Sequence, residues 1–185
     1  MSRLRAWARN APCPEVWAVR LHRMAHGLWV RGHPTAAQWL QTLGRVLTGV
    51  DIDPAARMGP GLEISHGVGL VVGPDVVTGP SCVLRQCVTL GGNGRVKGMP
   101  HLGARVQVGA NAVLLGPITV GDDAWIGAGA VVLCDVPAGC VAVGNPARVL
   151  PPKSERAQIQ VPRGAGGGAQ APLSVPARHS SRIRQ

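Results

Sequence analysis

The feature that most constrains the fold of this chain is a six-residue spacing of apolar side chains that begins at Ile52. The spacing is interrupted by one step of eight residues and one step of twelve. The positions are Ile52, Met58, Ile64, Val72, Thr78, Leu84, Leu90, Leu102, Val108, Leu114, Val120, Ile126 and Val132. Ordinary alternating strands show a period of two, and eight of these positions are followed directly by Gly. A period of six with Gly in register predicts a parallel β-helix built from hexapeptides.

The residue types around the repeat agree with this interpretation. A small, β-branched or Cys residue follows the apolar position by four residues, at Ala56, Val76, Cys82, Val88, Val106, Ala112, Ile118, Ala124 and Ala130. In a three-sided coil the aliphatic side chain points inwards, the smaller residue fits the corner, and Gly allows the turn. The chain has no Phe and no Tyr. We attribute their absence to a prism too narrow for large rings.

The chain divides into three parts. Residues 1–50 are predicted to be a short helical segment, with helical spacing over residues 14–31 and 35–47 and a break at Gly32–Pro34. Residues 51–150 are predicted to be the β-helix. Residues 151–185 are basic, rich in Pro and Gly and without periodicity, so a disordered tail is expected there.

The two breaks in the repeat are the expected places for function, because loops on a rigid scaffold often carry it. The eight-residue step contains Ser65, His66 and Gly67. The twelve-residue step is polar and rich in Gly, and residues 91–101 are predicted to form a loop outside the prism.

Charge and cysteine content exclude several classes of protein. The net charge of +10 comes from the ends, since residues 51–150 carry six basic and seven acidic side chains. No nucleic-acid-binding motif accompanies the charge, and no apolar run reaches the ~20 residues that span a bilayer. Five cysteines without a C-x-x-C pair indicate reduced thiols in the cytoplasm. We therefore expect neither nucleic acid nor a membrane as partner.

Five segments within residues 20–150 together resemble the serine O-acetyltransferase family of hexapeptide acyltransferases. They are His22–Trp29, Leu47–Pro54, Ile64–Gly73, Val88–Gly92 and Gly144–Arg148. The resemblance implies a left-handed parallel β-helix that forms a homotrimer or a dimer of trimers, with active sites between neighbouring prisms. It also implies acetyl transfer from acetyl-CoA to L-serine, which gives O-acetylserine for cysteine biosynthesis.

His66 and Asp51 are the expected catalytic residues. Acylation of an alcohol needs a base for the hydroxyl proton, and an imidazole titrates near neutral pH. Asp51 lies fifteen residues earlier, close to one coil, so it could stack beside His66 and hold the imidazole. The family's catalytic pair corresponds to these two positions. We expect direct attack on the thioester without an acyl-enzyme, with a backbone N–H near Gly91–Gly92 facing the oxyanion.

Further site residues follow from the resemblance. Gly92, Ala110 and Ala128 match positions along the pantetheine arm of the CoA. His22 and His26 are spaced i, i+4, but without a following Glu no metal site is expected.

The sequence departs from the family pattern around the substrate. Ser65 stands where the family has Asp, and either Met99 or His101 takes the place of its second loop histidine. The family's carboxylate-binding arginine is absent, and Arg95 or Lys97 is the candidate replacement. The chain ends Ile183–Gln185, without the terminal isoleucine that docks into cysteine synthase, so a stable complex with that enzyme is not predicted. The alternatives are a different hydroxyl acceptor, such as a sugar or a secondary metabolite, and an inactive scaffold subunit.

Overall fold

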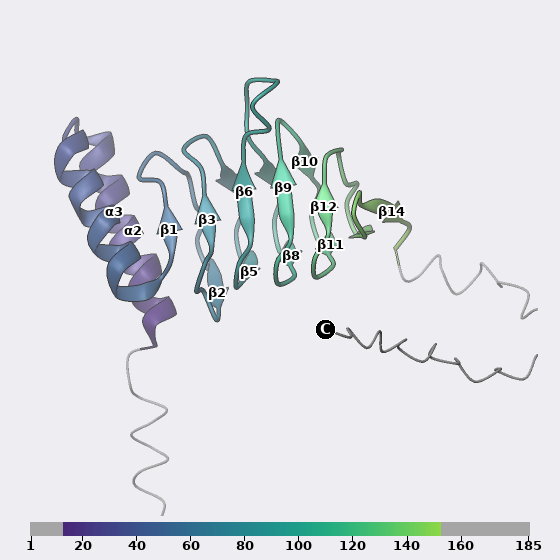
Figure 1. Cartoon of the computed structure of the whole chain (residues 1–185), viewed down its shortest axis with the longest axis horizontal. Helices are drawn as coiled ribbons and strands as arrows, with labels where there is room; N and C mark the ends of the chain where they lie inside the picture. The colour runs from purple at the N-terminus through teal and green to yellow at the C-terminus, as the bar shows by residue number, and fades with distance from the viewer. Residues whose placement is uncertain (1–12, 153–185) are drawn as a thin grey trace, which may run out of the picture.

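Two antiparallel helices cover one end of a coiled stack of short strands (Figure 1). The computed structural model describes residues 13–152, and the predicted tail beyond residue 152 lies outside the described part. Helix α2 spans Pro14–Val30 and helix α3 spans Pro34–Thr48, within a residue or so of the predicted bounds. Neither described helix is long and apolar enough to cross a membrane.

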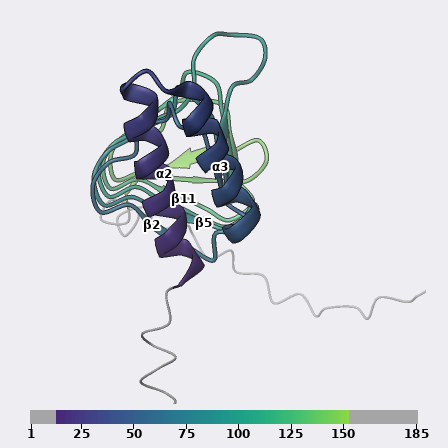
Figure 2. The same ribbon diagram turned by 90° about the vertical axis from the view of Figure 1, so that its left-hand side faces the viewer.

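The helix boundaries follow from local chemistry. Each helix begins with a proline in its first turn, where the missing N–H is not needed. Gly49 ends α3 in the left-handed region at φ 71°. Each helix buries a small residue, Ala25 in α2 and Gly44 in α3. Viewed along the stack of coils, the two helices lie across the end of the prism (Figure 2).

The strands form three faces of a prism. The first face holds β1 (Asp51–Ile52), β3 (Val71–Val72), β6 (Thr89–Gly91), β9 (Val113–Leu115) and β12 (Val131–Val132). The second face holds β4 (Val77–Thr78), β7 (His101–Leu102) and β10 (Thr119–Val120). The third face holds β2 (Glu63–Ser65), β5 (Val83–Arg85), β8 (Gln107–Val108), β11 (Trp125–Ile126), β13 (Val141–Val143) and β14 (Arg148–Leu150). Each pairing is parallel except β13 with β14, so the predicted parallel β-helix is confirmed.

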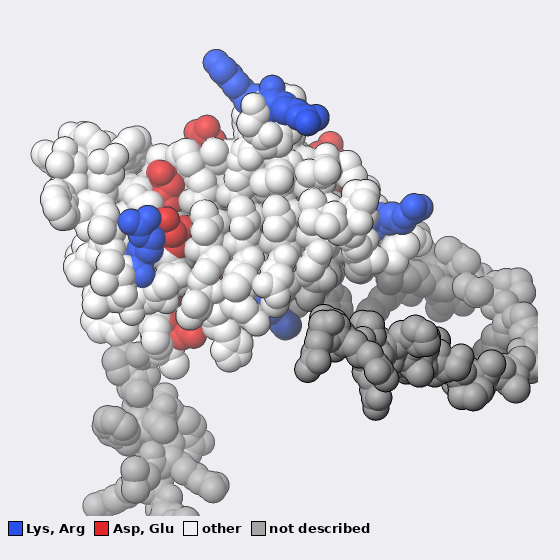
Figure 3. Space-filling model, in the orientation of Figure 1, with Lys and Arg blue, Asp and Glu red and all other residues white. Residues whose placement is uncertain are grey.

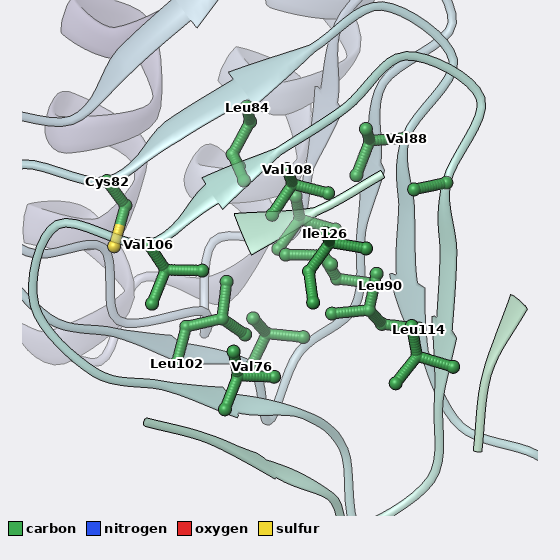
Figure 4. Close-up of a cluster of buried hydrophobic side chains, with 14 of the residues drawn as sticks. Val76, Cys82, Leu84, Val88, Leu90, Leu102, Val106, Val108, Leu114 and Ile126 are labelled. Atoms are coloured by element: carbon green, nitrogen blue, oxygen red, sulfur yellow. The ribbon is translucent and has the colours of Figure 1, made fainter. Parts of the chain in front are cut away.

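The six-residue repeat forms the core. Every repeat position is buried except Met58, which is half-buried, and every corner residue four positions later is buried too. Equivalent side chains stack from coil to coil, as Leu84, Val108 and Ile126 do on the third face (Figure 4). The hexapeptide spacing therefore decides which side chains fill the prism.

The two register breaks change the length of the coils. Asp51 pairs with Val71, 20 residues later, whereas Val71 pairs with Thr89 after 18. Thr89 pairs with Val113 after 24 residues, because the segment between β6 and β7 rises out of the prism as a loop (Figure 1). Both breaks are thus insertions into a regular coil, of two and six residues.

Candidate active site

His66 lies on the two-residue insertion, at the edge between the third and first faces. It follows β2, adopts a left-handed backbone at φ 57°, and is exposed. Gly67 behind it is buried, and a Cβ there would lie 2.6 Å from side-chain carbons of both Val50 and Ile64. The insertion therefore passes so close to the core at residue 67 that a side chain there would clash. The buried Gly67 keeps the neighbouring His66 at the surface.

A hollow beside His66 is formed together with the helices. Its lining includes His66 and Val68 from the insertion, Glu15 from α2 and Leu47 from α3. Glu15 brings a carboxylate to this hollow from the first turn of α2. The sequence interpretation did not identify Glu15, because nothing in the repeat indicates which helix residues face the insertion.

We call the corner between the third and first faces the His66 edge. Residues Val68, Gln86, Ala110 and Ala128 occupy equivalent corners there in successive coils. A backbone hydrogen bond connects each corner to the next coil. The N–H of the residue after each later corner donates to the carbonyl of the corner before it: Cys87 to Val68 O (3.0 Å), Asn111 to Gln86 O (3.0 Å) and Gly129 to Ala110 O (2.8 Å). Three coil steps of ~4.8 Å separate the first corner from the last, or ~14 Å. The corners at Ala110 and Ala128 carry small side chains, so the edge leaves room there for an extended chain.

Asp51 lies on β1 with its carboxylate held by helix α3. Gln41 Nε2 donates to Asp51 Oδ1 at 2.7 Å, and Arg45 Nη1 lies 3.3 Å from Asp51 Oδ2. No hydrogen bond joins Asp51 to His66 among residues 13–152. Val71, rather than a residue of the insertion, is in register with Asp51. Asp51 and His66 remain the predicted catalytic pair.

Gln41 and Arg45 are the partners that sequence reasoning missed. They lie four residues apart on α3, so they share one face of the helix. That spacing, directly before Asp51, is the signal that could have identified them.

The loop between β6 and β7 lies at the edge between the first and second faces, which we call the loop edge. Gly92 and Arg95 are exposed in the loop, and Asn93 Oδ1 accepts the N–H groups of Arg95 (3.0 Å) and Val96 (2.9 Å). Figure 3 shows basic side chains at the tip of this loop. The loop therefore presents positive charge away from the prism.

Met99 and His101 differ in their surroundings at the loop edge. Met99 is half-buried and its Sδ fills the space beside Gly73. His101 is exposed at the start of β7, where it pairs with Val77 and Thr119. His101 is therefore the imidazole that this edge offers to a ligand.

The predicted site residues fall on two edges of one chain. Ser65, His66, Ala110 and Ala128 lie on or next to the His66 edge. Arg95, His101 and Gly92 lie on the loop edge, where the N–H of Gly116 bonds to Gly91 O at 2.9 Å. The first face separates the two groups, so a single chain does not gather them around one point.

The cysteines form no disulfide and the described residues form no metal site. All five cysteines are free. Cys82 is buried, and desolvation raises the pKa of its thiol, whereas Cys87 is exposed at a corner. Within residues 13–152, no three His, Cys, Asp or Glu side chains gather closely enough to hold a metal ion.

Comparison with known proteins identifies the relatives of the chain. Residues 99–135 match the family model described as bacterial transferase hexapeptide (six repeats). The chain is 46% identical over 139 residues to serine acetyltransferases from Synechococcus elongatus and Helicobacter pylori. These alignments cover 74% of this chain, 57% of the Synechococcus protein and 81% of the Helicobacter protein.

A solved structure gives the same result. Serine acetyltransferase from Brucella abortus, in complex with coenzyme A, superposes with a TM-score of 0.73 at 39% identity. The match covers 75% of this chain and 56% of that one, so this chain spans little more than half of the Brucella protein. With the β-helix, the exposed His66 and these identities together, the chain belongs to the serine acetyltransferase family.

Proposed function

We propose that this chain transfers the acetyl group of acetyl-CoA to the hydroxyl of L-serine, giving O-acetylserine and free CoA. The observation that carries the proposal is the exposed His66 on its insertion, in a chain 46% identical to serine acetyltransferases. The product would serve cysteine biosynthesis. A cytoplasmic location belongs to the proposal, because all five cysteines are unpaired.

The proposed reaction is a direct transfer. His66 accepts the hydroxyl proton as the serine oxygen attacks the thioester carbonyl, and the CoA thiolate leaves and takes up a proton. The Asp51 carboxylate supplies negative charge near the base, and a backbone N–H at Gly91–Gly92 stabilises the oxyanion. The row of small corners at Ala110 and Ala128 would receive the pantetheine arm.

A complete site requires two copies of the chain. His66 and the corner row lie on one edge of the prism, and Arg95, His101 and Gly92 lie on another. A cyclic trimer, alone or paired with a second trimer, would bring the His66 edge of one copy to the loop edge of the next. The proposed substrate pocket, with Ser65, Arg95 and His101, then lies between copies.

Mixed assemblies test this arrangement. His66→Ala and the double variant Arg95→Ala/His101→Ala should each be inactive alone. Co-expression in equal amounts should restore about a quarter of the wild-type activity, because about a quarter of the interfaces combine two intact edges. No recovery in mixed trimers would contradict a shared site, and so would full activity of the loop variant.

The acceptor is tested by release of the CoA thiol. Acetyl-CoA is mixed with L-serine, homoserine or a panel of sugars, with His66→Ala as control. Serine-dependent release that is lost in His66→Ala supports the proposal. Faster release with another hydroxyl compound would favour that compound as the acceptor. The uncharged Ser65 beside His66 is the observation that favours this alternative. No release with any acceptor would favour a scaffold role.

A further inference from the structure

A hollow on a different side of the molecule gathers positive charge. It lies between α2 and the coils beneath it, lined by His22, Arg23 and His26 from the helix and by Arg57 and Thr78 from the prism. Among the residues that the structure describes, no Asp or Glu lines it. The two ion pairs found within residues 13–152 involve neither Arg23 nor Arg57. Arg23 and Arg57 thus line one hollow, and no carboxylate of residues 13–152 lines it with them.

His22 contributes a buried polar atom that the fold leaves unsatisfied. Its side chain is only 6% exposed, and its Nδ1 has no hydrogen-bond partner among the described residues. Burial, together with the positive charges of His26 and Arg23, lowers its pKa from 6.5 to about 4. A buried polar atom without a partner costs about 1–3 kcal/mol. Such a group next to a hollow is therefore expected to have a ligand.

His26 is held in a fixed orientation at the same hollow. Its Nδ1 lies 2.7 Å from Pro54 O, and because a carbonyl only accepts, Nδ1 carries the hydrogen. The rings of His22 and His26 lie 6.0 Å apart between centroids. The second nitrogen of His26 becomes a donor when the ring takes up a proton.

We propose that this hollow binds a small tetrahedral oxyanion, with phosphate and sulfate as the chemical class. Arg23 and Arg57 supply the charge, and guanidinium groups suit the paired oxygens of such an ion. A divalent cation fits the two histidines by spacing alone, but the two guanidinium groups would repel it. The site is separate from the His66 edge and does not depend on acetyl transfer.

Binding of the anion should be linked to uptake of protons. The charged and titratable groups that line the hollow are His22, Arg23 and His26 from α2 and Arg57 from the prism, and Val77 and Thr78 of β4 add none. An anion favours the charged form of His22, the imidazole whose pKa burial and the nearby positive charges lower to about 4. Affinity for sulfate, whose charge does not change in this range, should therefore increase as the pH is lowered from 7 towards 4.

The test is a titration of the full chain with inorganic phosphate, followed by the ring resonances of ¹⁵N-labelled histidines. Sulfate and chloride at matched ionic strength are run in parallel. The expected result is a saturable shift of the His22 and His26 signals with phosphate and sulfate, and little movement with chloride or at His101. Arg23→Gln/Arg57→Gln should weaken phosphate binding about tenfold or more. Arg85→Gln, an exposed arginine on the third face, is the matched control and should leave it unchanged.

Three outcomes would overturn the proposal. The first is the absence of a saturable shift at His22 and His26. The second is equal phosphate affinity in Arg23→Gln/Arg57→Gln and Arg85→Gln. The third is movement of both signals with Zn²⁺ but not with phosphate. Circular dichroism of each variant verifies that the change lies in binding rather than in folding.

Discussion

Gly67 is the residue on which the position of His66 depends most directly. In Gly67→Ala the new Cβ would lie 2.6 Å from carbons of Val50 and Ile64, both of which are buried. Carbon atoms prefer ~3.5–4.0 Å, so the insertion has to move by about 1 Å. Overpacking of this kind costs ~1–3 kcal/mol. A shift of about 1 Å in a catalytic group can cost about 100-fold in rate.

The assay combines thermal unfolding with CoA-thiol release at one protein concentration. For a chain of this size, ~1–3 kcal/mol corresponds to a fall in Tm of roughly 2–12 °C. Gly27→Ala is the matched control, because nothing lies within 4 Å of its added Cβ in the interior of α2. That change should stabilise the protein by ~0.5–1 kcal/mol without altering the rate. A Gly67→Ala protein with wild-type Tm and wild-type rate would refute the reasoning.

Three further predictions concern single side chains. The pKa of His22 falls from 6.5 to about 4 on folding, so its stabilising contribution is present above pH 6.5 and is lost as the pH falls towards 4. Wild type should lose ~2 kcal/mol more than His22→Gln between pH 7 and pH 5 in urea unfolding, and parallel curves would contradict this. Gln41→Ala should lower kcat more than Arg45→Met, because its bond to Asp51 is shorter, 2.7 Å against 3.3 Å, and Arg45 is 55% exposed. The reverse order in steady-state kinetics would be evidence against it. Thr78→Val should cost ~1–3 kcal/mol in urea unfolding, because the buried hydroxyl accepts a backbone N–H at 3.0 Å, and an unchanged midpoint would exclude this role.

The fold could be predicted because its rules are local. A six-residue spacing determines the inward face of each strand, and every repeat position except Met58 is buried as expected. The helices were predictable from apolar spacing together with Pro34 and Gly49, which act within a turn. Even the loop after β6 followed from its failure to continue the spacing.

The arrangement of the site was less predictable, because it depends on contacts between distant elements. A separation of fifteen residues suggested that Asp51 lies beside His66, and the insertion makes this coil 20 residues long, so residue counting alone does not determine how the two side chains lie. The partners of Asp51 come from α3, whose side chains have no register with the coils. The assignment of Ala110 and Gly92 to different edges likewise requires counting which face each strand joins.

The helices and the last two strands have a consequence for how the protein remains a discrete particle. A stack of parallel coils ends in open strand edges, and such edges can add further chains without limit. Helix α3 packs on β1 and helix α2 packs on β2, which covers one end of the stack. At the other end β14 runs antiparallel to β13, so the strand edge of the third face has the wrong polarity to continue the parallel ladder. These caps direct association to the sides of the prism, and end-to-end fibres are disfavoured.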